Sequence, residues 1–101
     1  MQIIKSVIEK IDEELMDSEK YIDCAYKVRD DYPELSTVYF RLSKEEMAHM
    51  QSLHDQVVRL IENYQKEHGE VPPDMKVLYD YLHARQIEWA MKIEFKQKNY
   101  K

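Results

Sequence analysis

The residues Asp30-Asp31-Tyr32-Pro33 form a short break between two long amphipathic segments, and this break sets the topology of the chain. Asp is favoured in front of a helix and Pro at its first positions, so a helix is expected to begin at Pro33 with an Asp as its cap. A second break at residues 69–74 combines Gly69, suited to a helix end, with two prolines that cannot continue a helix. The breaks predict three helices, at residues 2–30, 33–66 and 73–97.

Length and composition predict one soluble all-α domain, residues 1–101. The single Gly and three Pro leave room for few turns, while 35% charged and 44% apolar residues are typical of amphipathic helices. A net charge of −5 argues against nucleic-acid and anionic-membrane partners, which need a basic face. Cys24 is the only cysteine, so an intrachain disulfide and a thiolate zinc cluster are excluded. The sequence has no apolar stretch long enough to be a signal peptide or a membrane span. A cytoplasmic location is therefore the simplest expectation.

A stripe with heptad spacing runs along each of the first two predicted helices. The short break predicts that they form an antiparallel hairpin about 45–50 Å long, packed along these stripes. The third predicted helix has a broader apolar arc. A hairpin of this length leaves apolar surface that one further helix does not cover, so self-association is expected. The stripes consist of Val7, Ile11, Glu14, Ser18, Tyr21, Ala25, Val28 and Tyr32, and of Leu35, Tyr39, Leu42, Glu46, His49, Leu53, Gln56 with Val57, and Leu60.

Three polar residues interrupt the stripes: Glu14, Glu46 and His49. Glu14 lies about 26 Å from the turn and the midpoint of Glu46 and His49 about 25 Å, so all three are expected at one level. A buried, unpaired carboxylate costs several kcal/mol, roughly, unless it is compensated. The compensation is a bound cation, a shared proton or a water-filled gap. Carboxylate and imidazole suit iron, manganese and zinc.

The sequence here resembles the ferritin-like superfamily, in its rubrerythrin and encapsulated-ferritin types. Glu14, Tyr21 and Ala25 match the first-helix pattern, and Glu46-Met-Ala-His49 matches the Glu-x-x-His motif of the second helix. Tyr32-Pro33-Glu34-Leu35 is similar to the helix connection of encapsulated ferritins. The resemblance covers about residues 7–60 and implies one half-site per chain.

The resemblance implies a four-helix bundle completed by dimerisation, with Glu14, Glu46 and His49 given by each chain to two iron ions. Manganese and zinc are the alternative metals. Glu46 would bridge the ions, Tyr21 would donate a hydrogen bond behind the ligands, and Asp17 would be an outer or ion-access carboxylate. The partner is a second copy, in a homodimer or a higher even oligomer.

Two functions follow as hypotheses. The first is a ferroxidase-type oxidoreductase whose only catalytic groups are the metal ligands. The second is a non-enzymatic structural or interaction protein on a ferritin-like scaffold, with Glu14, Glu46 and His49 as a buried polar network. No Gly-rich phosphate loop or nucleophile motif supports a nucleotide-binding protein or a hydrolase.

The remaining histidines fit no site in the sequence. His54 follows His49 by five residues, which turns it away from the stripe, so it is interpreted as a flank or surface residue. Asp80 and His83 form a second acid–His pair one helical turn apart, but no partner helix is evident for them. They are interpreted as a solvated or interface pair, and a second metal site is the alternative.

Overall fold

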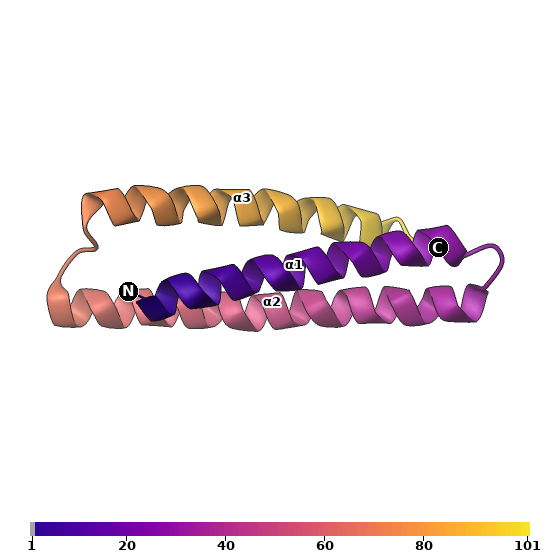
Figure 1. The fold of residues 1–101 in the computed structure, drawn as a ribbon, viewed down its shortest axis with the longest axis horizontal. Coiled ribbons are helices and arrows are strands. Elements are labelled where there is room, and N and C mark those ends of the chain that lie inside the picture. The colour runs from indigo at the N-terminus through magenta and orange to yellow at the C-terminus, as the bar shows by residue number, and fades with distance from the viewer. Residues whose placement is uncertain (1) are drawn as a thin grey trace.

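Three long helices run side by side in a computed structural model that describes residues 2–101 (Figure 1). They are α1 (Gln2–Val28), α2 (Pro33–His68) and α3 (Pro73–Lys98). The Cα atoms span 56 × 18 × 18 Å, with the α1–α2 turn at one end and the α2–α3 connection at the other. The predicted all-α fold, a long antiparallel hairpin plus a third helix, is confirmed, and each helix boundary lies within two residues of its prediction. Within residues 2–101, no helix is both long and apolar enough to cross a membrane.

The two connections show which helix-end signals were correct. Gly69 adopts φ 82°, the left-handed region that favours glycine, and its N–H donates to the Gln65 carbonyl at 2.9 Å. The predicted Asp cap of α2 is wrong, because Tyr32 precedes the helix and no side chain caps it. Pro33 carries no N–H, so the first turn of α2 has one donor fewer to satisfy.

The core lies between all three helices, and its position corrects the predicted stripes. On α1 the buried residues are centred on Ile11, Leu15 and Ser18, whereas Val7, Glu14, Tyr21 and Val28 lie half-buried on one flank. α3 packs along the other flank of the hairpin and draws the centre of burial toward itself. The buried residues are Ile4, Ile8, Ile11, Leu15, Ser18, Ile22 and Ala25 on α1, Ser36, Ser43, Met50 and Val57 on α2, and Tyr79, Gln86, Ala90, Ile93 and Gln97 on α3.

The half of the core nearest the α1–α2 turn is held by buried hydroxyls. Ser18 Oγ donates to the Ser43 carbonyl at 2.8 Å, and Ser43 Oγ donates to the Ser18 carbonyl at 2.7 Å. Gln97 of α3 donates to Ser43 Oγ at 2.9 Å, and Ser36 Oγ donates to the Ala25 carbonyl at 2.6 Å. These small side chains let α1 and α2 approach closely while every hydroxyl named has a partner.

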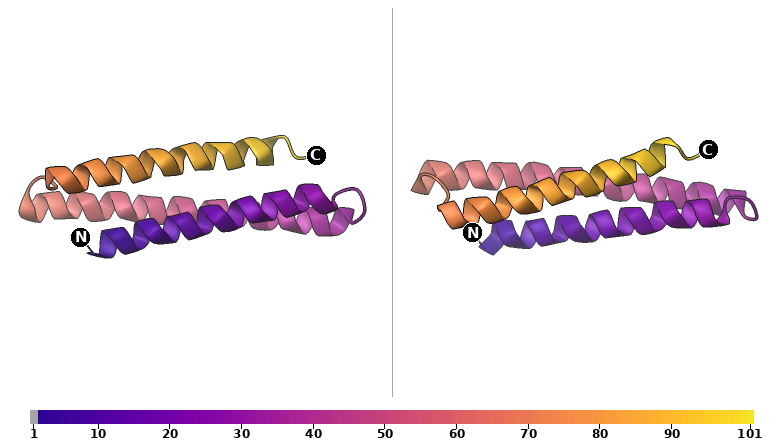
Figure 2. Two further views of the ribbon diagram at one scale, coloured as in Figure 1. Left: turned by 45° about the horizontal axis from the view of Figure 1, so that its top comes forward. Right: turned by 90° about the horizontal axis from the view of Figure 1, so that it is seen from above.

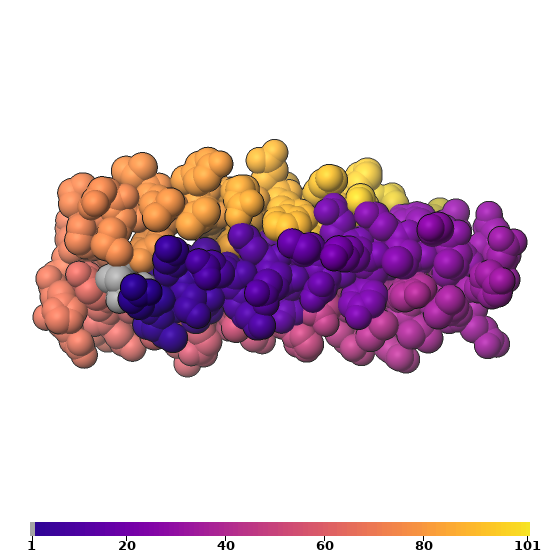
Figure 3. Space-filling model, viewed as in Figure 1, coloured from indigo at the N-terminus to yellow at the C-terminus, as the bar shows by residue number. Residues whose placement is uncertain are grey.

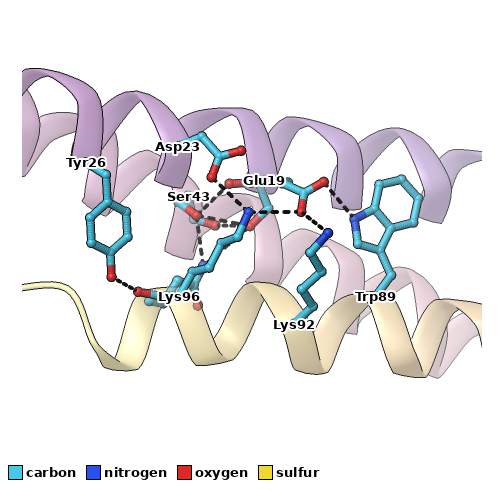
Figure 4. A network of polar contacts seen from close by, with 9 residues as sticks. Glu19, Asp23, Tyr26, Ser43, Trp89, Lys92 and Lys96 are labelled. Carbon is cyan, nitrogen blue, oxygen red and sulfur yellow. Dashed lines mark hydrogen bonds and ion pairs between the residues drawn. The ribbon is translucent and has the colours of Figure 1, made fainter.

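α3 packs mainly against α1 and makes few contacts with α2. Figures 2 and 3 show α3 running along α1 from the N-terminal end of the hairpin toward the turn. In Figure 4, Lys96 reaches from α3 to Glu19 at 3.3 Å and to Asp23 at 2.9 Å, both on α1. Trp89 donates to Glu19 at 3.3 Å, and the Tyr26 hydroxyl donates to the Lys96 carbonyl at 2.6 Å. These contacts define the covered flank of the hairpin, which is the side of α1 and α2 against α3.

Candidate metal centre

Glu14, Glu46 and His49 meet on the open flank of the hairpin, the side that α3 does not cover. The Nδ1 atom of His49 lies 3.7 Å from Oε2 of Glu14 and 3.7 Å from Oε2 of Glu46. One ligand atom from each residue lies within 4.8 Å of the other two. The structure therefore places the three predicted residues at one level, as their distances from the turn required.

The two carboxylates are much less accessible than the imidazole. The Glu14 side chain is 17% exposed and that of Glu46 21%, whereas that of His49 is 60% exposed. Oε2 of Glu14 is buried without a hydrogen-bond partner, the one such side-chain atom within residues 2–101. This oxygen has lost its hydration without gaining a hydrogen bond, and His49 Nδ1 lies 3.7 Å from it, so it fits the role of a cation ligand.

Glu46 is the residue whose protonation responds most to this arrangement. Its proximity to Glu14, which can accept a hydrogen bond from the protonated acid, together with burial and the Glu14 charge, raises the pKa of Glu46 to about 7. His49 lowers this pKa and Asp17 raises it further, but neither effect changes the outcome. Two carboxylates this close resist ionising together, and a cation between them removes that resistance.

Glu19 on the covered flank is a carboxylate with Lys side chains nearby, and its pKa shifts in the opposite direction to that of Glu46. Burial acts to raise the pKa of Glu19, but the hydrogen bond and charge of Lys96, with Trp89 and Lys92, lower it overall. No Lys or Arg of residues 2–101 forms an ion pair with Glu14 or Glu46, whose ion pairs are with His49. The open flank therefore has acid groups without the basic side chains that the covered flank provides.

Asp17 lies one helical turn after Glu14, and Tyr21 lies two turns after it, about 10 Å along α1. The Tyr21 ring stacks on Tyr39 with centroids 6.1 Å apart, on the same flank as Glu14. Asp17 is exposed, and its charge contributes to raising the pKa of Glu46. Their assignments as a hydrogen-bond donor and an ion-access carboxylate stay predictions.

Sequence reasoning missed one juxtaposition of chemically active side chains. His54 of α2 is half-buried, and its ring stacks on His83 of α3, with centroids 5.0 Å apart and planes at 10°. A signal for it exists in the sequence, because Met47, His54 and Ile61 are spaced by seven residues, and His54 and Ile61 line a cavity together with residues of α3. Using that signal requires knowing which flank α3 covers.

No protein-family model matches this chain, and no match is found among curated proteins or among solved structures.

Proposed function

We propose that two copies of this chain bind a pair of iron ions between their open flanks and oxidise ferrous to ferric iron. The observation that carries the proposal is the convergence of Glu14, Glu46 and His49 within 4.8 Å on one flank, with Oε2 of Glu14 buried and unpartnered. The choice of iron follows the ferritin-like pattern of Glu14, Tyr21 and Glu46-x-x-His49. Manganese and zinc suit the same ligands.

Three donors from one chain leave an ion of this class short of ligands. Ferritin-like di-iron sites use two such sets of carboxylates and imidazoles on facing helices. A second copy, facing the first across the open flank, would supply another Glu14, Glu46 and His49. Exposed apolar side chains on the same flank favour this pairing, since Leu35 is 42% and Val38 37% exposed in the single chain.

Each ligand has a distinct part in the proposal. Glu46, with its raised pKa, would release its proton as iron binds and then bridge the two ions. Glu14 would use its unpartnered oxygen, and His49, the exposed member, would be the ligand nearest the partner copy. Carboxylate oxygens favour the ferric state, so this ligand set lowers the energy needed to remove an electron from ferrous iron.

The redox balance requires an oxidant from solution. Two ferrous ions give one electron each, and these two electrons with two protons reduce dioxygen to hydrogen peroxide. With hydrogen peroxide as oxidant, two electrons and two protons give two waters. The iron pair is the substrate, and the protein's contribution is to hold both ions close enough to serve one oxidant molecule.

The test is to load the purified chain with ferrous iron in air and to follow ferric absorbance. Glu46→Ala is expected to slow oxidation to the rate of free iron, because it removes the bridging carboxylate. Glu45→Ala is the matched control, since the Glu45 side chain is 53% exposed and pairs with Arg41. Equal rates for the wild type and Glu46→Ala would contradict the proposal.

The second candidate is a non-enzymatic helical protein. The raised pKa of Glu46 favours this candidate, because a proton shared between Glu46 and Glu14 can take the place of a metal ion. The discriminating measurement is thermal melting with and without a chelator. A metal that binds only the folded protein raises the melting temperature, so a chelator must lower it. Identical melting of a well-formed dimer with and without chelator would select the shared-proton network.

A further inference from the structure

We infer that His54, His83 and Asp80 form a second metal site, for a divalent cation of the zinc class, between α2 and α3. The observation is the stack of the two imidazoles, whose centroids lie 5.0 Å apart across the two helices. Asp80, one helical turn before His83, lines the same cavity as both rings. The site is independent of the proposed iron site, and its test does not rely on that proposal.

The cavity beside the stack has room for a hydrated ion. Its volume is about 210 Å³, and its walls are mainly apolar side chains, among them Ile11, Val57 and Tyr79. The polar groups His54, Asp80 and His83 open onto it. The Asp80 side chain that lines it is largely exposed, so an ion held there would stay in contact with water.

The donor set matches a known preference of zinc. Two imidazoles and a carboxylate, with water in the fourth position, give the tetrahedral arrangement of open zinc sites. His54 is half-buried and His83 exposed, and the ion pairs of histidine within residues 2–101 involve His49 and His68 instead. In the described part of the chain, the group whose ligand atoms all lie within 4.8 Å of one another is Glu14, Glu46 and His49, so His54 and His83 have to turn out of their stack to bind an ion. A shared zinc ion would hold one nitrogen of each ring at about 2.0–2.1 Å.

Asp80 is the ligand that must change partner. In the structure it accepts a hydrogen bond from Lys76 at 2.7 Å, in an ion pair whose side chains are 66% and 67% exposed. Exposed pairs of this kind stabilise a protein little, so Asp80 can turn from Lys76 to the ion at small cost.

The site lies on the opposite side of α2 from the proposed iron site. His54 follows His49 by five residues, which turns its side chain by about 140° around the helix axis. An ion held by His54 and His83 would tie α3 to α2, the pair of helices with the least contact. Zinc binding would therefore stabilise the position of α3 without occupying the open flank.

The test is calorimetric titration of zinc into the Glu46→Ala chain, in which the first site is disabled. One zinc ion per chain is expected to bind, and His54→Phe or His83→Phe in that background is expected to weaken binding at least about tenfold, since even loss of a group behind a ligand has that effect. Phenylalanine keeps the ring stack and removes the nitrogens. His68→Phe is the control, because His68 packs on Tyr64 elsewhere on α2.

Equal zinc affinity in the background chain and in both phenylalanine variants would overturn the inference, as would the absence of zinc binding to Glu46→Ala. If a phenylalanine variant does not fold, as judged by circular dichroism, the Glu46→Ala chain itself is modified with diethyl pyrocarbonate. Zinc is then expected to protect His54 and His83 and to leave His68 reactive. Equal modification of all three with and without zinc would contradict the site.

Discussion

The two flanks of the α1–α2 hairpin differ in the side chains that surround their carboxylates and in the direction of the resulting pKa shifts. On the covered flank, Glu19 meets Lys92 and Lys96 of α3, and these contacts lower its pKa. On the open flank, Glu14 and Glu46 meet each other and His49, and the pKa of Glu46 rises to about 7. The chain thus supplies its own cations where α3 packs, and leaves its acids without Lys or Arg partners where a second copy and metal ions are proposed to bind.

The largest expected difference between the flanks is in packing. Leu15→Ala on α1 is expected to lower the free energy of unfolding by about 2–5 kcal/mol, because a fully buried leucine leaves a cavity. Leu35→Ala on the open flank should lower it by only about 1 kcal/mol in dilute, monomeric protein, because that side chain is 42% exposed. Urea denaturation measures both values. Equal losses would mean that the open flank is already covered.

At higher protein concentration Leu35→Ala is also expected to affect self-association. If the open flank pairs with another copy, the variant should weaken self-association, seen as a shift of the sedimentation profile toward monomer. Val77→Ala is the control, because Val77 lies on α3 and is 70% exposed. An unchanged profile for Leu35→Ala, or an equal shift for Val77→Ala, would place the interface elsewhere.

The next largest effect is the pH dependence of the metal-free chain. Folding raises the pKa of Glu46 from 4.5 to about 7, so its protonated form stabilises the folded state below pH 4.5, and this stability is lost as the pH rises through about 7. The loss amounts to at most about 3 kcal/mol. Glu46→Gln should remove this part of the pH dependence and raise the metal-free melting temperature at pH 8.

Glu45→Gln is the matched control for that measurement, because Glu45 is the exposed neighbour of Glu46 and pairs with Arg41. It should keep the pH dependence of the wild type. Melting curves from pH 4 to 9 in the presence of a chelator compare the three chains. A Glu46→Gln chain with the wild-type pH dependence would show that Glu46 ionises without difficulty in the folded state.

A smaller effect is expected in the hydroxyl cluster between α1 and α2. Ser43→Ala removes the acceptor of the Gln97 amide and the donor to the Ser18 carbonyl, both buried. The Ser18 carbonyl is left unpaired and Gln97 keeps only its 3.4 Å hydrogen bond to Ser18 Oγ, so the free energy of unfolding should fall by about 1–3 kcal/mol. Ser52→Ala is the control, since Ser52 is exposed and bonds only to the Ala48 carbonyl of its own helix. Equal small losses would show that water replaces the lost partners.

The smallest effect concerns the ion pairs of the covered flank. A double-mutant cycle of Lys96→Met and Glu19→Gln should give a coupling of about 0.5–1 kcal/mol that weakens in high salt, as expected for a partly exposed pair. Lys76→Met with Asp80→Asn, whose side chains are both far more exposed, should give a coupling near zero. A coupling energy of zero between Lys96 and Glu19 would contradict the claim that Lys side chains stabilise the carboxylates of the covered flank.

The helices and the proximity of the three ligand residues were predictable from local rules. Gly69 and Pro33 mark helix boundaries by their own conformational limits, so no tertiary knowledge is needed. Glu14 and Glu46 come level because an antiparallel hairpin fixes depth through the rise per residue alone.

The flank on which α3 packs was not predictable, and this explains the remaining differences. Ile8 and Ile22 belong to the core because α3 covers that side. In the predicted stripe Ile11, Ser18 and Ala25 are also buried, whereas Val7 and Tyr21 stay half-buried. The stack of His54 on His83 depends on the same choice. Sequence spacing alone does not determine on which side of the hairpin the four residues 69–72 place the third helix.

A metal site shared between two copies is tested by analytical ultracentrifugation of the chain with ferrous iron under nitrogen, with the iron content of each sedimenting species measured. We expect iron to shift the chain to a dimer that holds one ion per chain, and we expect Glu46→Ala to lack both that iron and the shift. Iron bound equally by monomer and dimer, or an unchanged iron content in Glu46→Ala, would contradict a metal site shared between two open flanks.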